Sequence, residues 1–124
     1  MPARTPDEVD RLFAQALNDG DAEGIVALYE PNACLVPQPG TTAVGTEAIR
    51  QAVEGLLAMK PKISLETQSP LVVGDVALTT SRWRLTGSSP DGDPVDMNGV
   101  SAEVARRQPD GTWRFVIDNP FPGS

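Results

Sequence analysis

The chain has 124 residues, 17 acidic and 10 basic, giving a formal net charge of −7 at pH 7. It has one cysteine and no histidine, which excludes a Ser-His-Asp triad, an internal disulfide and a His-rich or four-cysteine zinc site. The acidic balance argues against a nucleic acid partner, and the apolar runs are too short for a membrane helix. Because the chain shows no secretory signal, we expect one cytoplasmic domain spanning residues 1–124.

The first half of the chain predicts three helices and a short strand. The first helix begins at Thr5, which stands three residues before a glutamate as in a capping box, and ends at Gly20. A second, short helix is expected over about residues 22–29, a strand over 33–37, and a third helix from Thr46 to the Lys-Pro pair at 60–61. The first helix has an apolar stripe, formed by Val9, Leu12, Phe13, Ala16 and Leu17.

The second half of the chain predicts strands. Residues 63–73, 75–86, 95–107 and 112–118 are rich in Val, Thr, Leu, Trp and Ile, and turn-forming residues separate them. Three helices followed by antiparallel hairpins indicate an α+β fold.

Three segments resemble the nuclear transport factor 2-like superfamily, and within it the SnoaL-like and ketosteroid-isomerase-like proteins. They read ALNDGDAEGIVALYEPNACLV, GTEAIRQAVEGLL and DGTWRFVIDNPF, and the resemblance covers about residues 6–121. It implies a cone-shaped, strongly curved antiparallel sheet that wraps around three helices and encloses a pocket. It also implies a homodimer through the outer sheet face. Because this cone hosts several chemistries and also proteins with none, the fold alone does not give the function.

The resemblance allows the ketosteroid isomerase apparatus to be checked. Phe13 stands where that family has its catalytic tyrosine, and Pro37 is nearest to the position of its aspartate base. A third position, a protonated aspartate that donates to the oxyanion, falls near Glu103. A proton shuttle without its base cannot run that reaction, so we reject this activity and keep the architecture.

The last strand provides the candidate catalytic residues. Side chains of a strand alternate between its faces, and the register of the isomerases places Val116 and Asp118 toward the pocket, with Asn119 beside them. Counting back from the preceding turn puts Glu103 roughly opposite Asp118. Two carboxyl groups in one dry pocket repel each other and raise one pKa, which supplies acid–base chemistry without histidine.

Structural alternatives stay open for both carboxyl groups. Asp118 stands before Asn119 and Pro120, so it is also consistent with a turn at a strand end. For Glu103, the alternative to a catalytic role is a cross-strand ion pair with Arg82, Arg84 or Arg106.

The candidate pocket wall depends on which face of the 75–86 strand points inward. Burial favours the face of Trp83, because an unpaired buried guanidinium would be costly, whereas the isomerase register favours the face of Arg82 and Arg84. We expect Trp83 and Met97 to line the pocket. Tyr29 is expected in the core, with its hydroxyl within reach of the pocket.

We therefore expect a small-molecule-binding cone protein that forms a homodimer. Its chemistry would be cofactor-free and metal-free proton transfer on a small apolar or carbonyl-bearing compound, as in an isomerase, cyclase or dehydratase. Asp118 would act as base or acid, Glu103 as its partner and Asn119 as a donor to an oxyanion. The alternative is a non-catalytic ligand carrier or oligomerisation module. The expected ligand-binding residues are Phe13, Tyr29, Trp83, Met97 and Val116.

Overall fold

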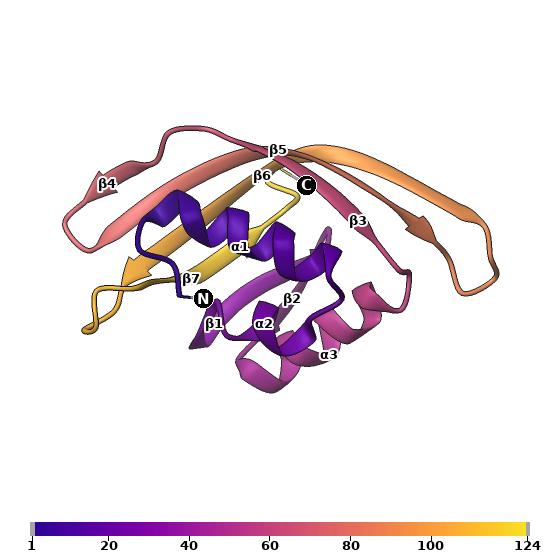
Figure 1. Cartoon of the computed structure of the whole chain (residues 1–124), viewed down its shortest axis with the longest axis horizontal. Coiled ribbons are helices and arrows are strands. Elements are labelled where there is room, and N and C mark those ends of the chain that lie inside the picture. Colours follow the sequence, from indigo (N-terminus) through magenta and orange to yellow (C-terminus); the bar gives the residue numbers. More distant parts are fainter. Residues whose placement is uncertain (1, 124) are drawn as a thin grey trace.

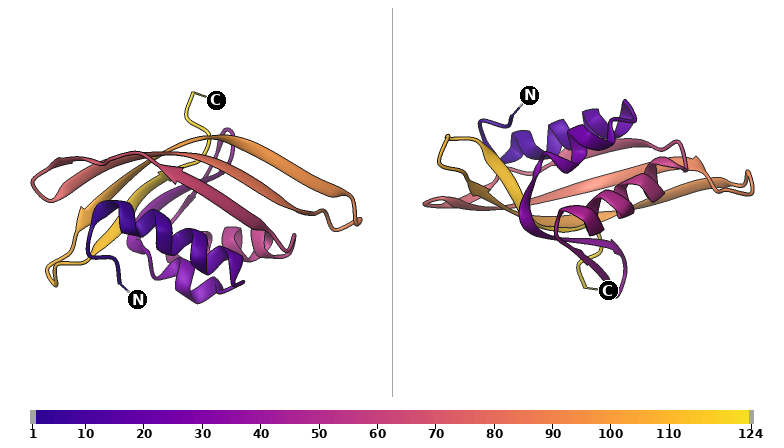
Figure 2. Two further views of the ribbon diagram at one scale, coloured as in Figure 1. Left: turned by 45° about the horizontal axis from the view of Figure 1, so that its top comes forward. Right: turned by 90° about the horizontal axis from the view of Figure 1, so that it is seen from below.

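The computed structural model describes residues 2–123 and has three helices on the concave side of a curved sheet (Figure 1). Figure 2 shows from two further directions that all three helices lie on the same face of this sheet. The expected α+β cone is therefore confirmed. None of the described helices is long and apolar enough to cross a membrane.

The helices are α1 (Pro6–Asn18), α2 (Ala22–Val26) and α3 (Thr46–Leu57). Pro6 occupies the first turn of α1, where its missing N–H costs nothing. The capping box at Thr5 is not formed by the threonine side chain; instead, Oε1 of Glu8 accepts a hydrogen bond from the Arg4 backbone N–H at 2.5 Å. Asp21 caps α2 by accepting from Gly24 N at 2.9 Å.

Two helix boundaries differ from the prediction. The second helix ends at Val26, because residues 29–38 continue as a strand that pairs with the last strand of the chain. The cap of α3 is Gly45 rather than Thr46, with a positive φ of 91° that glycine adopts without strain.

The sheet has seven strands in the described chain. They are β1 (Tyr29–Gln38), β2 (Thr41–Val44), β3 (Lys62–Thr67), β4 (Leu71–Val73), β5 (Val76–Ser88), β6 (Pro94–Arg107) and β7 (Trp113–Asn119). Their order is β2-β1-β7-β6-β5-β3, with β4 also paired to β5. The prediction of a purely antiparallel sheet is wrong for one pair, since β1 and β7 run parallel. The predicted strand over 63–73 is divided into β3 and β4, and β2 was not predicted.

A bulge in β7 changes which of its side chains face the helices. Ile117 lies opposite Val104, and Phe115 lies opposite the next residue of β6, which leaves Val116 as the extra residue. The alternation of faces therefore shifts by one position at Val116. As a result, Phe115 and Asp118 are both buried, whereas Ile117 is 42 % exposed on the outer face.

The core lies between the concave face of the sheet and the apolar stripes of the helices. Its most buried large side chains come from α1, α2, α3 and β7, and they are Leu17, Val9, Ile25, Ile49 and Phe115.

Close approach of β5 to the end of α3 leads to the first prediction. A Cβ added at Gly87 would lie 2.7 Å from the backbone oxygen of Met59, which itself accepts a hydrogen bond from Ser88 N at 2.8 Å. We expect Gly87→Ala to lower the free energy of unfolding by about 1–3 kcal/mol, because the backbone has to move apart. Urea unfolding measures this change.

Gly55→Ala in α3 is the matched control for Gly87→Ala. A Cβ at Gly55 meets nothing within 4 Å, so alanine should stabilise the helix by about 0.5–1 kcal/mol. Equal effects of the two alanines would contradict the close packing of β5 on α3.

Candidate functional site

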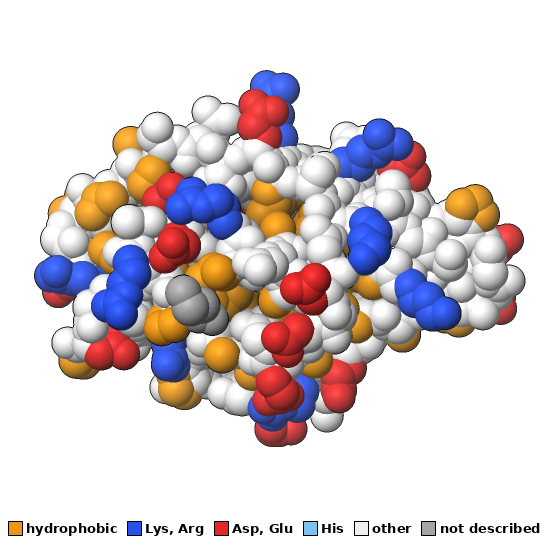
Figure 3. All heavy atoms as spheres, viewed as in Figure 1, with side chains coloured by type: hydrophobic (Ala, Val, Ile, Leu, Met, Phe, Trp, Pro, Cys, Tyr) orange, Lys and Arg blue, Asp and Glu red, His pale blue; other side chains and the backbone are white. Residues whose placement is uncertain are grey.

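A cavity of about 480 Å³ lies between the concave face of the sheet and the helices. Among the residues that line it, Gln38, Gly55 and Met97 are exposed. On the face drawn in Figure 3, hydrophobic side chains show between scattered charged groups. A cavity of this size and composition is typical of a small-molecule site.

Aromatic rings form much of the cavity wall. The chain has six aromatic residues, and five of them line the cavity: Phe13, Tyr29, Trp83, Phe115 and Phe121. Rings pack edge-on in two pairs, with centroids 6.3 Å apart for Phe13 and Phe115 and 5.8 Å apart for Trp83 and Phe121. These contacts hold the rings in fixed orientations.

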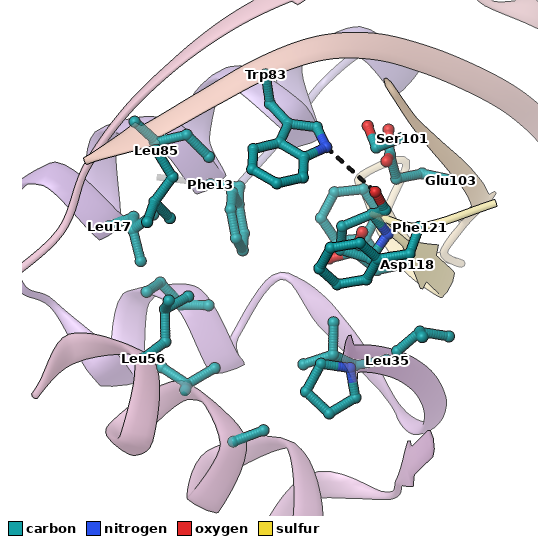
Figure 4. A pocket seen from close by; sticks show the side chains of 18 of the residues that line it. Phe13, Leu17, Leu35, Leu56, Trp83, Leu85, Ser101, Glu103, Asp118 and Phe121 are labelled. Carbon is teal, nitrogen blue, oxygen red and sulfur yellow. Dashed lines mark hydrogen bonds between the residues drawn. The ribbon is translucent and has the colours of Figure 1, made fainter. Parts of the chain in front are cut away.

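The indole of Trp83 is fixed by two neighbours. Its Nε1 donates to the backbone oxygen of Pro120 at 3.2 Å, as the dashed line in Figure 4 marks. Gly99 is its cross-strand partner, and a Cβ there would lie 3.0 Å from the indole ring, so glycine leaves the room that the ring occupies.

Three carboxyl groups line one end of the cavity. They come from different elements: Asp10 from α1, Glu103 from β6 and Asp118 from β7. Glu103 and Asp118 are Cα partners in the β6–β7 pairing, as the sequence register predicts. All three residues are at most 6 % exposed. In Figure 4, Glu103 and Asp118 lie on the side opposite to Leu17, Leu56 and Leu85.

Hydroxyl groups donate to two of these carboxyls. The Tyr29 hydroxyl donates to Oδ2 of Asp118 at 2.5 Å, and the Thr79 hydroxyl donates to Oε1 of Glu103 at 3.1 Å. The Asp10 carboxyl is in hydrogen-bonding contact with that of Glu103. Oδ2 of Asp10 is buried and receives no hydrogen bond from any N–H or hydroxyl group of the described chain. A proton carried by Glu103 can satisfy this contact.

Burial raises the pKa of all three carboxyl groups. The pKa of Glu103 rises to about 10, because the negative charges of Asp118 and Asp10 add to desolvation. Desolvation raises the pKa of Asp118 to about 7, although the hydrogen bond from Tyr29 opposes the rise. Desolvation also raises the pKa of Asp10 to about 6. At neutral pH the site therefore holds a protonated acid beside a partly ionised one, as acid–base catalysis requires.

Four predicted ligand-binding residues line the cavity: Phe13, Tyr29, Trp83 and Met97. The preference for the Trp83 face of the 75–86 strand is confirmed, because Arg82 and Arg84 point outward and are exposed. Arg84 pairs with Asp96 and Arg106 with Glu30, so neither forms the alternative ion pair with Glu103.

Two predicted placements are wrong. Val116 does not line the cavity, because the bulge in β7 places Phe115 there instead. Asn119 also lies outside the lining; its Oδ1 accepts a hydrogen bond from Phe121 N at 3.0 Å, which turns the chain after β7. The sequence analysis gave a turn at the strand end as the alternative role of Asp118. Asn119 makes this turn instead.

Asp10 was missed by the sequence analysis. It stands three residues before Phe13 and seven before Leu17, so it shares the helix face that these residues bury. A carboxyl inside an apolar stripe is the signal that could have identified it. No group of three or more His, Cys, Asp or Glu side chains within residues 2–123 is arranged to hold a metal ion.

The raised pKa values predict that stability falls as pH rises. Between about pH 4 and the folded-state pKa of each group, the folded protein binds more protons than the unfolded chain, so the free energy of unfolding decreases with pH. For Asp118, whose pKa is about 7 when folded, this loss develops from about pH 4 to about pH 7. We expect urea unfolding to show a fall of at least about 2 kcal/mol across this range.

Asp118→Asn should reduce this pH dependence, because an amide does not titrate, and the slope that remains comes from Glu103 and Asp10. Asp91→Asn, in the exposed β5–β6 connection, serves as the control and should keep the slope of the natural protein. A free energy of unfolding that rises from pH 5 to pH 8 would contradict the buried carboxyl cluster.

Comparison with known proteins places these features in a family. The family described as the SnoaL-like domain matches residues 9–117. No curated protein matches the chain. Among solved structures, a ketosteroid isomerase-like protein from Erwinia carotovora atroseptica has a TM-score of 0.81 at 16 % identity, covering 90 % of this chain and 88 % of that one.

Two further solved structures have the same fold. A candidate dehydratase of the NTF2-like family from Streptomyces avermitilis has a TM-score of 0.76 at 20 % identity, with 91 % of this chain and 90 % of that chain covered. A candidate calcium/calmodulin-dependent protein kinase II association domain from Xanthomonas campestris has a TM-score of 0.74 at 23 % identity, with 99 % and 96 % covered. At these identities the likeness shows the fold alone. With the family match over residues 9–117, the chain belongs to the SnoaL-like domain family.

Proposed function

We propose that this protein binds a small hydrophobic molecule in the cavity and catalyses a cofactor-free proton transfer on it, as in an isomerisation, cyclisation or dehydration. The observation that carries the proposal is the pairing of Glu103 with Asp118 across β6 and β7, inside an apolar cavity. Glu103 and Asp118 both carry a carboxyl group, but their surroundings differ, so one can be protonated while the other is ionised at neutral pH. Enzymes use such a pair when a reaction needs both an acid and a base.

The base in this proposal is Asp118, and the acid is Glu103. The Asp118 carboxylate takes a proton from a carbon next to a carbonyl group, and the electron pair of the C–H bond becomes the carbon–carbon double bond of an enol. The carbonyl π electrons move to the oxygen, which receives the proton of Glu103. The hydrogen bond from Tyr29 stabilises the ionised form of Asp118 between turnovers.

With a conjugated enol, Asp118 returns the proton to the γ-carbon while the enol oxygen gives its proton back to Glu103, which completes an isomerisation. In a dehydration, Asp118 takes the α-proton, the electron pair of the C–H bond forms the double bond, and the β-hydroxyl leaves as water with the proton of Glu103. Transfer of the proton from Asp118 to Glu103 then restores the site. Ketosteroid isomerase chemistry itself is not proposed, because Phe13 and Pro37 line the cavity where that family has its tyrosine and its base.

Removal of the proposed base tests this function. Asp118→Asn should lower the rate of proton abstraction by about 10²–10⁴-fold, because an amide cannot accept the proton. The assay follows deuterium incorporation at the α-carbon of small cyclic ketones in heavy water by proton NMR, so no natural substrate is needed. The control is Asp91→Asn, which lies far from the cavity lining.

Thermal unfolding of the same variants completes the test. Asp118→Asn should not unfold the protein, because its amide oxygen still accepts from the Tyr29 hydroxyl. Exchange at the α-carbon that is equally fast in the natural protein and the Asp118 variant would refute the proposal.

The outer face of the sheet supports a second function, assembly with another copy of the chain. Six side chains follow each other as direct cross-strand neighbours from β2 to β4; we call them the outer row, and they are Val44, Cys34, Ile117, Val104, Leu78 and Leu71. Four of them are 41–69 % exposed. An exposed apolar band of this length is typical of a protein contact, and two identical faces can cover each other in a symmetric dimer.

A charge within the outer row tests this assembly. Ile117→Glu combined with Leu78→Glu should convert a dimer into a monomer, because each copy would bury unpaired carboxylates against the other. Light scattering after gel filtration measures the mass, and Gln15→Glu on the exposed side of α1 is the control. A natural protein that is monomeric at all concentrations would exclude the assembly function.

A further inference from the structure

The charge of the cavity lining is one-sided. Its titratable residues are Asp10 from α1, Tyr29 from β1, Glu103 from β6 and Asp118 from β7, while the residues contributed by α3, β3 and β5 do not titrate. Within residues 2–123, no lysine or arginine lines the cavity. The charge at this end is therefore negative or zero. An anionic ligand would meet repulsion that low-dielectric surroundings strengthen, whereas a cation would be attracted.

Most of the side-chain donors at this end are already engaged, although the Ser101 hydroxyl also lines the cavity. The Tyr29 hydroxyl already donates to Asp118, the Thr79 hydroxyl to Glu103, and the Trp83 indole to the Pro120 carbonyl. Oδ2 of Asp10 receives nothing from any hydroxyl or N–H group of the described chain, although Asp10 lines the cavity and is only 3 % exposed. A ligand N–H group can take the place of the Glu103 proton as the donor to this carboxyl.

The wall beside the carboxyl groups is also suited to a cation. Five aromatic residues line the cavity, and the faces of aromatic rings attract cations, with tryptophan the strongest. Figure 4 shows Trp83 and Phe121 between the carboxyl end and the leucine end of the cavity. The leucine end, with Leu17, Leu56 and Leu85, is apolar and suits a hydrocarbon group.

We infer that the ligand of this cavity is a hydrophobic compound with one cationic nitrogen, whose N–H group donates to Asp10 beside the aromatic wall. Its hydrocarbon part lies against the leucine end. This inference rests on the proposed function, because it names the class of molecule on which Glu103 and Asp118 act. An ammonium group at Asp10 also replaces the contact with Glu103 and leaves the Glu103 proton free for the substrate.

Ligand charge should then be coupled to protonation of the site. A cation near the carboxyl groups favours their ionised forms, because its positive charge offsets the repulsion that raises the pKa of Asp118 and Glu103. Binding of a cation therefore releases protons, and its affinity increases with pH. A neutral ligand of the same shape lacks both effects.

Three ligands that differ in one group test the inference: 3-phenylpropylamine, 3-phenylpropan-1-ol and 3-phenylpropionate. Isothermal titration calorimetry should show that the amine binds at least about tenfold more tightly than the alcohol and that the carboxylate does not bind. The amine stays protonated from about pH 5.5 to about pH 7.5, and its affinity should increase over this range. Titrations in buffers of different ionisation enthalpy measure the released protons.

Two variants identify the group that recognises the cation. Asp10→Asn should weaken amine binding about tenfold and leave alcohol binding unchanged, whereas Asp7→Asn, on the same helix but outside the lining, should change neither. Phe121→Leu, near the end of the chain, is a second variant that tests the inference if Asp10→Asn does not fold. It should reduce amine binding more than alcohol binding, because it removes an aromatic face.

Equal binding of amine and alcohol, binding of none of the three ligands, or full amine binding by Asp10→Asn would overturn the inference. The ketone exchange assay remains independent of these outcomes. Exchange that depends on Asp118, together with no preference for the amine, would remove the ligand class and leave the proposed proton transfer in place.

Discussion

The extra residue in β7 determines what each face of the sheet presents. In a regular strand, a buried Phe115 would bring Ile117 to the same face and turn Asp118 to the outside. The bulge at Val116 shifts the alternation, so that Phe115 and Asp118 both reach the cavity and Ile117 joins the outer row. The bulge thus allows the core residue Phe115 and the cavity carboxyl of Asp118 to lie on the same face of one strand. A regular strand could place one of them on that face but not both.

Much of this arrangement follows from sequence pattern. The apolar stripe of α1, the inward face of Trp83 and the pairing of Glu103 with Asp118 were predicted from periodicity, burial and counting from a turn. The bulge was not predictable, because Phe, Val and Ile at positions 115–117 all favour strands and no glycine marks the irregularity. The correct face for Asp118 and the wrong face for Val116 both came from the resemblance to the isomerases, whose register was applied with regular alternation of the strand faces.

Asp10 and Tyr29 show a different limit of sequence analysis. Asp10 interrupts the apolar stripe of α1, but acidic residues near a helix N-terminus are common, as Asp7 and Glu8 in the first turn show, so its position alone does not establish a buried site residue. Its burial depends on β6, which lies more than eighty positions later in the chain. The hydrogen bond from Tyr29 to Asp118 likewise joins residues 89 positions apart. Contacts of this kind depend on the assembled sheet and not on the local sequence.

The same desolvation and charge repulsion make the carboxyl cluster unfavourable for folding and suited to the proposed proton transfer. Buried ionisable groups destabilise a protein unless they are paired, and solvent-exposed ion pairs such as Arg84 with Asp96 contribute little to stability. The repulsion and desolvation that destabilise the site also separate the pKa values of Glu103 and Asp118 and create an acid and a base without histidine. On β6 and β7 these residues are the direct neighbours of Val104 and Ile117 in the outer row. A slip of either strand by one residue would turn its carboxyl group toward the proposed dimer contact and its apolar neighbour toward the cavity. The proposed cavity chemistry and the proposed assembly therefore favour the same register, which would give the strand pair a specificity that burial of apolar surface alone does not provide.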